Sequence, residues 1–313
     1  MMSHQTPVGP PSAPDANPTE SFPLPQGCEE GYLTANGTRL HYVAAGQGPL
    51  VLLLHGFPQF WYAWRRQLPA LAERFRVVAL DLRGYNLSEK PAHGYDIVTL
   101  SGDIRAAIEA LGEREAALVG HDWGGLVAWA TAIRSPDCVS RLAILNAPHP
   151  AVALHHSRSL DQMRRSRYIA YFQLRGLAER AIAARDFNAI RQVFRVDDPS
   201  GVWLSELDVE RYIAAISRPG VLEAALAYYR ALPRPTSYFT LSPMRMLHMP
   251  TLVLWGELDR ALGPYLLDGL DRWVTDLRVR RFPTATHWLN EQEPEQVNAE
   301  LLRFLSGESG GAQ

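Results

Sequence analysis

The sequence predicts an α/β fold in which a mostly parallel central sheet is flanked by helices and carries an inserted helical cap. Short apolar runs alternate with segments of helical periodicity, and this alternation stops after Pro148 for about a hundred residues before it resumes. The apolar runs of the first half are Leu50–Leu54, Val77–Leu80, Ala116–Val119 and Leu142–Leu145, separated by helical segments such as Leu100–Leu111 and Gly125–Ile133.

The remaining elements follow from local signals. Asn36-Gly37 lies between two strand-like runs and predicts a hairpin, so the sheet opens with antiparallel strands. Helical patterning from Leu160 to about Ala231 predicts the cap, and strand character resumes at Thr251–Trp255 and Arg278–Phe282 before a last amphipathic helix. We therefore expect a disordered tail over 1–27, a core formed by 28–148 and 248–313, and a cap over 149–247.

Composition excludes several classes of function. With 313 residues and 47% hydrophobic side chains, the chain can bury one large core, although its length alone would also permit two domains. Its net charge of -2 gives no basic field that would hold nucleic acid. No apolar run is long enough to span a bilayer, so no membrane partner is expected. Only Cys28 and Cys138 are present and the amino terminus has no secretory pattern, which predicts a cytoplasmic protein with no disulfide, metal or cofactor.

The strongest chemical signal is a strand, a tight turn and a helix around Asp122. Gly120 and Gly124 stand two residues before and two residues after it, as in a nucleophile turn, but with aspartate where serine is usual. The glycines permit the bend, and the helix N-terminus keeps the carboxylate ionised. The other interpretation of this short pattern is that Asp122 only caps the helix.

Four further residues fit a nucleophile at Asp122. The loop His55-Gly56-Phe57-Pro58 ends an earlier strand, so that the N–H groups of Phe57 and Trp123 could form an oxyanion hole. Asp259 and His287 each follow a later strand and complete the order nucleophile, acid, histidine. The carboxyl ends of parallel strands meet at one edge, where α/β sheets place their sites.

Taken together, these motifs resemble one family over Gly31 to Leu305. They are His55-Gly56-Phe57-Pro58, Trp61-Tyr62-Ala63-Trp64-Arg65, Asp81-Leu82-Arg83-Gly84-Tyr85, His121-Asp122-Trp123-Gly124-Gly125 and His287-Trp288. The chain is similar to α/β-hydrolases of the soluble epoxide hydrolase type, in which the cap contributes two tyrosines. The resemblance implies Tyr168 and Tyr229 at those positions. Asn86 departs from the family, which commonly has glycine there, and the middle of the cap matches poorly, so substrate shape does not follow from the resemblance.

Helical spacing gives a separate indication for the tyrosines. Leu222, Ala225, Leu226 and Tyr229 recur at positions of one helix face, so Tyr229 rather than Tyr228 should point inward. Tyr168 shares a stripe with Tyr171 and Phe172, and we interpret the last two as core residues.

These residues predict opening of an epoxide to a vicinal diol, with water as the second substrate and an alkyl ester on Asp122 as the intermediate. His287, oriented by Asp259, would activate the water, and the two phenols would donate to the alkoxide. A haloalkane or haloacid dehalogenase is the alternative. Haloacid enzymes carry arginines where this chain has Trp123 and Leu126, whereas Trp123 does not discriminate against haloalkanes and Trp203 could help bind halide. A non-catalytic ligand-binding protein on the same fold is the third hypothesis.

Overall fold

The computed structural model describes residues 22–234, 237–241 and 244–308. Most of the tail predicted over 1–27 therefore lies outside the described residues. The ring of Phe22, where the description begins, lies 4.8 Å from the ring of Phe60 in the core.

Within the described residues, the centre of the molecule is a sheet of eight strands in the order β1-β2-β4-β3-β5-β6-β7-β8. Asn36-Gly37 turns β1 into its antiparallel neighbour β2, β2 pairs antiparallel with β4, and all later pairings are parallel. Every residue of β3 is buried, as expected for a strand covered on both faces. The strands are β1 Glu29–Ala35, β2 Thr38–Ala45, β3 Leu50–Leu54, β4 Arg76–Leu80, β5 Ala116–His121, β6 Val139–Leu145, β7 Thr251–Gly256 and β8 Leu277–Phe282.

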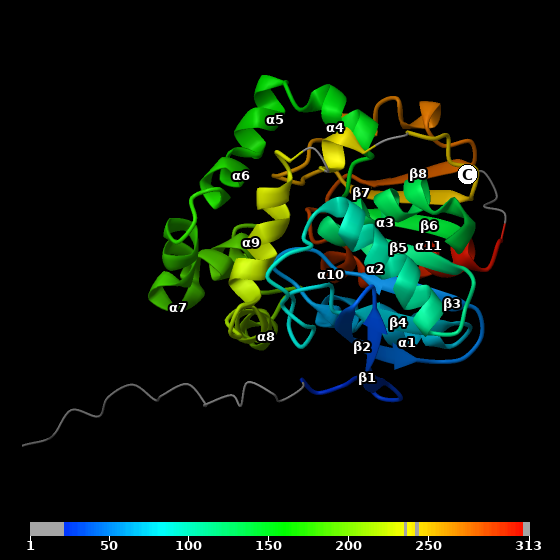
Figure 1. Cartoon of the computed structure of the whole chain (residues 1–313). Helices are drawn as coiled ribbons and strands as arrows, with labels where there is room; N and C mark the ends of the chain where they lie inside the picture. The colour runs from blue at the N-terminus through cyan, green and yellow to red at the C-terminus, as the bar shows by residue number, and fades with distance from the viewer. Residues whose placement is uncertain (1–21, 235–236, 242–243, 309–313) are drawn as a thin grey trace, which may run out of the picture.

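Helices cover both faces of this sheet, which confirms the predicted fold class (Figure 1). Helices α2 and α3 pack together against β1, β5 and β6, whereas α1 and α11 pack together behind the sheet, with α1 on β4. The helices of the core are α1 Gln67–Ala72, α2 Ile97–Ala110, α3 Trp123–Arg134, α10 Leu289–Gln292 and α11 Pro294–Leu305, and its short 3-10 helices are η1 Trp61–Trp64, η2 Pro136–Cys138, η4 Pro264–Leu267 and η5 Leu270–Arg272. None of the helices in the described ranges is long and apolar enough to cross a membrane.

A second group of helices lies between β6 and β7 in the sequence and over one edge of the sheet in space (Figure 1). Local signals set their starts: Ser159 caps α5, and Ser205 forms a capping box with Asp208 at the start of α8. This group comprises α4 Pro150–His156, α5 Leu160–Arg165, α6 Arg167–Phe172, α7 Leu177–Arg195, α8 Glu206–Ile216, α9 Val221–Ala231 and the 3-10 helix η3 Tyr238–Thr240. Helix α7 is interrupted by non-helical backbone over 184–187.

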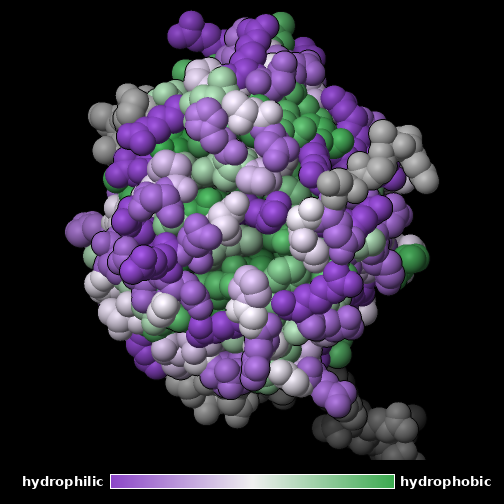
Figure 2. All heavy atoms as spheres, turned by 90° about the vertical axis from the view of Figure 1, so that its right-hand side faces the viewer, coloured by the Kyte–Doolittle hydropathy of each residue, from purple (hydrophilic) through white to green (hydrophobic). Residues whose placement is uncertain are grey.

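The face of the molecule turned away from α6, α7 and α8 is mainly hydrophilic. Figure 2 shows hydrophilic residues over most of it, with hydrophobic residues visible in the hollow between them. The loops that carry the motifs predicted to form the site lie at the carboxyl ends of the parallel strands. Because β3 pairs with β5 through Leu54 and Gly120, the loop after β3 and the turn after β5 leave the sheet side by side.

Candidate active site

Asp122 occupies a strained position between β5 and α3. Its φ is 51° and its ψ is -121°, a backbone conformation that residues other than glycine rarely adopt. The turn is also tightly packed, since a Cβ on Gly124 would lie 2.0 Å from the carbonyl oxygen of Leu54. The Asp122 side chain makes no capping hydrogen bond to α3, and its Oδ1 accepts the Phe57 N–H at 2.9 Å. This geometry argues against a role as a helix cap alone.

His287 lies between two carboxylates. Its Nδ1 donates to Oδ2 of Asp259 at 2.6 Å, and its Nε2 lies 3.6 Å from Oδ2 of Asp122. Asp259 is buried, and its other oxygen accepts the N–H groups of Ala261 and Leu262 at 2.8 and 2.9 Å. The loops after β5, β7 and β8 thus bring together the three residues predicted as nucleophile, acid and base.

Asn146, directly after β6, completes the surroundings of Asp259 and was not predicted from the sequence. Its Nδ2 donates to Oδ2 of Asp259 at 2.8 Å, and its Oδ1 accepts the Gly256 N–H at 2.9 Å. It therefore ties the acid to the end of β7. The signal for it was its place at the carboxyl end of a strand, the same place that pointed to the other site residues.

The charges of the three residues depend on one another. Burial lowers the pKa of His287, but the carboxylates of Asp259 and Asp122 outweigh it and raise that pKa to about 10. Burial raises the pKa of Asp122, but the hydrogen bond and charge of His287, aided by the Phe57 N–H, leave it below its ordinary value. At neutral pH the site therefore holds an imidazolium beside an ionised Asp122.

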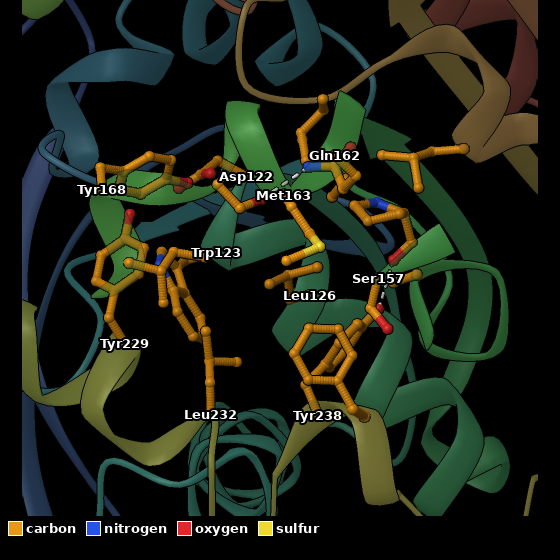
Figure 3. Close-up of a pocket in the computed structure, with 18 of the residues that line it drawn as sticks. Asp122, Trp123, Leu126, Ser157, Gln162, Met163, Tyr168, Tyr229, Leu232 and Tyr238 are labelled. Carbon is orange, nitrogen blue, oxygen red and sulfur yellow. Dashed lines mark hydrogen bonds between the residues drawn. The ribbon is translucent and has the colours of Figure 1, made fainter. Parts of the chain in front are cut away.

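Two phenols of the cap face Asp122 (Figure 3). Tyr168 comes from α6 and Tyr229 from α9, and their ring centroids lie 5.8 Å apart. Burial raises the pKa of both hydroxyls, and the negative charge of Asp122 raises them further. Both phenols thus keep their protons at neutral pH and can donate hydrogen bonds into the space in front of Asp122.

That space is a cavity of about 530 Å³ between the sheet edge and the cap. Asp122, Tyr168 and Tyr229 line one part of it, and the remaining wall is largely apolar. The apolar side chains include Leu126, Ala147, Pro148, Met163, Ile169, Leu232, Phe239, Leu262 and Leu266. A small apolar molecule with one polar reacting group would fit this lining.

Comparison with known proteins agrees with this geometry. Residues 49–294 match the model of the alpha/beta hydrolase fold family. The chain is 37% identical to mouse epoxide hydrolase 4, in an alignment that covers 88% of this chain and 78% of the mouse protein. It is 38% identical to the AB hydrolase superfamily protein YfhM of Bacillus subtilis, in an alignment that covers 88% of this chain and 98% of YfhM. A solved structure of a variant of Bacillus megaterium epoxide hydrolase has a TM-score of 0.83 and 36% identity, and covers 88% of this chain and 100% of its own. The chain belongs to the epoxide hydrolase family of α/β hydrolases.

In this member of the epoxide hydrolase family, the tyrosines of α6 and α9 differ in whether they face the cavity. Tyr229 lines the cavity, whereas Tyr228 points away from it and donates its hydroxyl to the carbonyl of Arg83 at 2.7 Å. The interpretation of Tyr171 as a core residue was wrong, because its side chain is 41% exposed at the end of the short helix α6, while Phe172 is buried.

Trp123 and Trp203 lie in different places relative to the cavity, since Trp123 lines it beside Asp122. The Trp123 ring packs edge-on against Tyr228 and Tyr229. Of the two backbone N–H groups predicted to form the oxyanion hole, that of Phe57 donates to the Asp122 carboxylate, and within the described residues that of Trp123 does not. Trp203 is not among the described residues that line the cavity, and its carbonyl accepts a hydrogen bond from Arg66.

Proposed function

We propose that this enzyme hydrolyses epoxides to vicinal diols through an ester on Asp122. The observation that carries the proposal is the placement of two protonated phenols opposite an ionised carboxylate. Opening an epoxide produces a strongly basic alkoxide, which needs a proton donor, whereas a halide leaves without one. Two phenols in front of the nucleophile therefore favour epoxide opening over dehalogenation.

The first step forms the ester. An oxygen of Asp122 attacks one epoxide carbon, the bond between that carbon and the epoxide oxygen breaks, and the oxygen takes a proton from Tyr168 or Tyr229. The ester carries no charge, so His287 loses one of the two carboxylates that raise its pKa. The imidazolium then gives up its proton, which restores the phenol, and His287 becomes a neutral base.

The second step hydrolyses the ester. Neutral His287 takes a proton from a water molecule, which attacks the carbonyl carbon of Asp122, and the N–H groups of Phe57 and Trp123 would stabilise the oxyanion. The intermediate collapses by breaking the bond to the alkyl oxygen, which takes the second proton of the attacking water from the Asp122 carboxyl group, and the diol leaves. His287 is again an imidazolium and Asp122 is again ionised, so the cycle ends in the protonation states with which it began.

The substrate class follows from the cavity. Its apolar lining and volume of about 530 Å³ suit a small epoxide with an apolar or aromatic substituent. A variant of the related Bacillus megaterium enzyme was solved with its product (R)-3-[1]naphthyloxy-propane-1,2-diol, whose substituent is an aryl ether. We also propose a cytoplasmic location, because Cys28 and Cys138 both carry free thiols.

A panel of aryl and alkyl epoxides, haloalkanes and fluoroacetate tests the proposal, with diol and halide measured separately. We expect diol from apolar epoxides and no halide from the halogenated compounds. A single turnover in heavy-oxygen water should place the label in Asp122 and not in the first diol, since the diol oxygen comes from the carboxylate. Halide release without diol, or label in the first diol, would contradict the proposal.

A further inference from the structure

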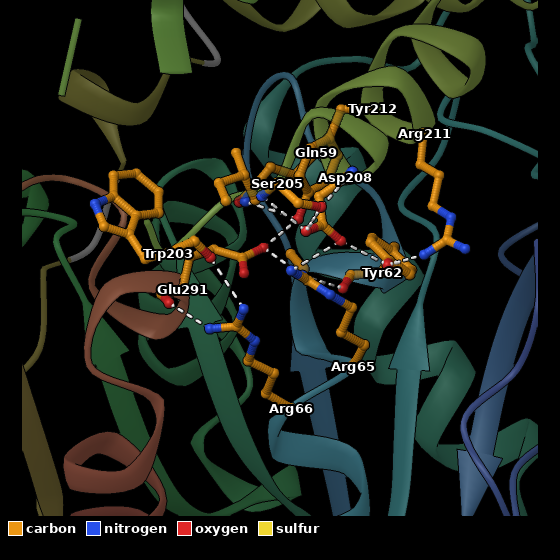
Figure 4. Close-up of polar contacts among 12 residues, drawn as sticks. Gln59, Tyr62, Arg65, Arg66, Trp203, Ser205, Asp208, Arg211, Tyr212 and Glu291 are labelled. Atoms are coloured by element: carbon orange, nitrogen blue, oxygen red, sulfur yellow. Dashed lines mark hydrogen bonds and ion pairs between the residues drawn. The ribbon is translucent and has the colours of Figure 1, made fainter. Parts of the chain in front are cut away.

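Two consecutive arginines connect the segment after His287 to the cap (Figure 4). Arg65 lies 2.7 Å from the carboxylate of Glu291, on α10, and 3.2 Å from that of Asp208, on α8. Arg66 donates to the carbonyl of Glu291 at 2.9 Å and to the carbonyl of Trp203, in the loop before α8, at 3.0 Å. Each arginine thus contacts one group that follows His287 and one group of the cap.

A chain of hydrogen bonds runs from the same place to His287 itself. The hydroxyl of Tyr212, on α8, donates to Glu291 and accepts the side-chain amide of Gln59 at 3.3 Å. Gln59 lies 3.2 Å from Nδ1 of His121, and Nε2 of His121 lies 2.8 Å from the carbonyl oxygen of His287. The side chains along this chain are buried.

A buried ion pair of this kind adds little net stability. The side chains of Arg65 and Glu291 are 10% and 1% exposed, and removing such a pair from water costs about as much as their attraction returns. What a buried, many-partner cluster provides is a fixed position for the segments that it joins. Here those segments are α8, α10 and the loop that carries His287.

The placement of the cluster separates it from the phenols. Tyr168 and Tyr229 lie on α6 and α9, whereas the contacts of the cluster with the cap are made by α8 and the loop before it. Glu291 is only four residues after His287, on the short helix α10. A change in the cluster should therefore displace His287 before it displaces the phenols. Asp122 is held separately, by the Phe57 N–H and by the turn between β5 and α3.

We propose that Arg66 and Tyr212 are positioning residues for His287, so that the seating of α8 on the core governs hydrolysis of the ester and not its formation. This inference rests on the proposed function for its kinetic test. Its structural part, the position of His287, can be measured without any epoxide.

The kinetic test compares ester formation and ester hydrolysis in single turnovers, followed by intact mass. Tyr212→Phe keeps the ring and its stacking on Phe194, and Arg66→Met keeps the aliphatic stem. Each should slow hydrolysis about tenfold and leave ester formation within about twofold, because small displacements of a base cost rate steeply. The ester should then accumulate, and Arg66→Lys should restore part of the rate.

Glu179→Gln is the matched control, because it removes the buried ion pair between Glu179 and Arg230 inside the cap without touching the core. It should leave hydrolysis unchanged. Equal slowing of both steps, no slowing in either variant, or selective slowing in Glu179→Gln would overturn the inference. A wild type that forms neither ester nor diol would overturn the proposed function instead.

Titration of the His287 imidazole, followed by NMR, tests its position even if the wild type forms neither ester nor diol. The titratable groups that face His287 are Asp259, Asp122, His121 and Asp197. Because its high pKa depends on close contact with the first two, a displaced ring should titrate at lower pH in Tyr212→Phe and Arg66→Met than in wild type. Identical titration in all three proteins would overturn the positioning role.

Discussion

At the scale of single residues, the two carboxylates beside His287 differ in how completely they are hydrogen-bonded. Asp259 accepts two backbone N–H groups, the amide of Asn146 and the imidazole, so its oxygens are held in place. Among the described residues, one backbone N–H donates to Asp122, and His287 lies 3.6 Å from its other oxygen. Because a carboxylate has about four acceptor positions, Asp122 keeps free lone pairs for attack while Asp259 does not.

Replacing His287 by Gln should trap the ester. Formation needs only Asp122 and the phenols, whereas hydrolysis needs a base for the water. Incubation with the best epoxide should therefore raise the mass of the intact variant by the mass of that epoxide, with turnover reduced at least about a hundredfold. A folded variant that gains no mass and makes no diol would remove His287 from the water-activating role.

Tyr168 and Tyr229 should share the donation to the epoxide oxygen. Either change to Phe should slow ester formation by about one to two orders of magnitude, since loss of one donor leaves the other in place, and the double variant should be nearly inactive. Rapid-quench kinetics of ester formation measures this. Tyr228→Phe is the control, because its hydroxyl bonds to a carbonyl away from the cavity. Wild-type activity in the double variant would refute both assignments.

At the scale of elements, prediction succeeded where a segment was long enough to show its own period. Apolar runs identified β3 to β7, and Asn36-Gly37 identified the hairpin of β1 and β2, because these signals are local. The short helices α1, α10 and η1 span too few residues for a periodic pattern to emerge. The same shortness misled the interpretation of Tyr171, since α6 has only six residues and its exposed side is not distinguishable from the sequence.

The tight packing of the turn between β5 and α3 predicts that an added methyl group there lowers the stability of the fold. Gly124→Ala should destabilise the fold by about 3 kcal/mol, because the added Cβ would meet the backbone of Leu54 at 2.0 Å and the turn has no room to relax. Urea unfolding measures the loss. In Gly102→Ala the new Cβ in α2 meets only the side-chain amide of Asn36 at 3.3 Å, so the change should be within about 1 kcal/mol of zero. Equal effects of the two changes would contradict this account.

At the scale of the whole molecule, the sequence predicted the order of the site residues but not the packing between distant segments. Asp122, Asp259 and His287 could be placed because each follows a strand, and parallel strands share an edge. The contacts of Arg65 with Asp208 and Glu291 join residues separated by more than a hundred positions, and no local pattern signals them. The cavity shape depends on such contacts, which is why the substituent on the substrate could not be predicted.

The stability of the whole fold should depend on pH through His287. Its folded pKa of about 10 lies above the unfolded value of about 6.5, so the native state holds a proton that the unfolded state has lost between these values. The contribution is complete below about pH 6.5 and disappears as pH rises through about 10. The free energy of unfolding of wild type minus that of His287→Gln, from urea titrations, should therefore fall between pH 7 and 10. A constant difference would mean that His287 is neutral in the native state.

The cap leaves the sheet after β6 and returns at β7, and these two strands are direct neighbours that pair through Leu145 and Leu254. Because the two strands are parallel, the insertion starts at the carboxyl end of β6 and ends at the amino end of β7, and the sheet fixes the separation of these two points whatever the length of the insertion. Closing such a loop costs only about 0.6 kcal/mol more for each doubling of its length. The cap can therefore be lengthened, shortened or exchanged during evolution with little strain on the sheet. An exchanged cap would bring with it both phenols and most of the residues that line the cavity. Chimaeras joined at this strand pair should take their substrate preference from the donor of the cap.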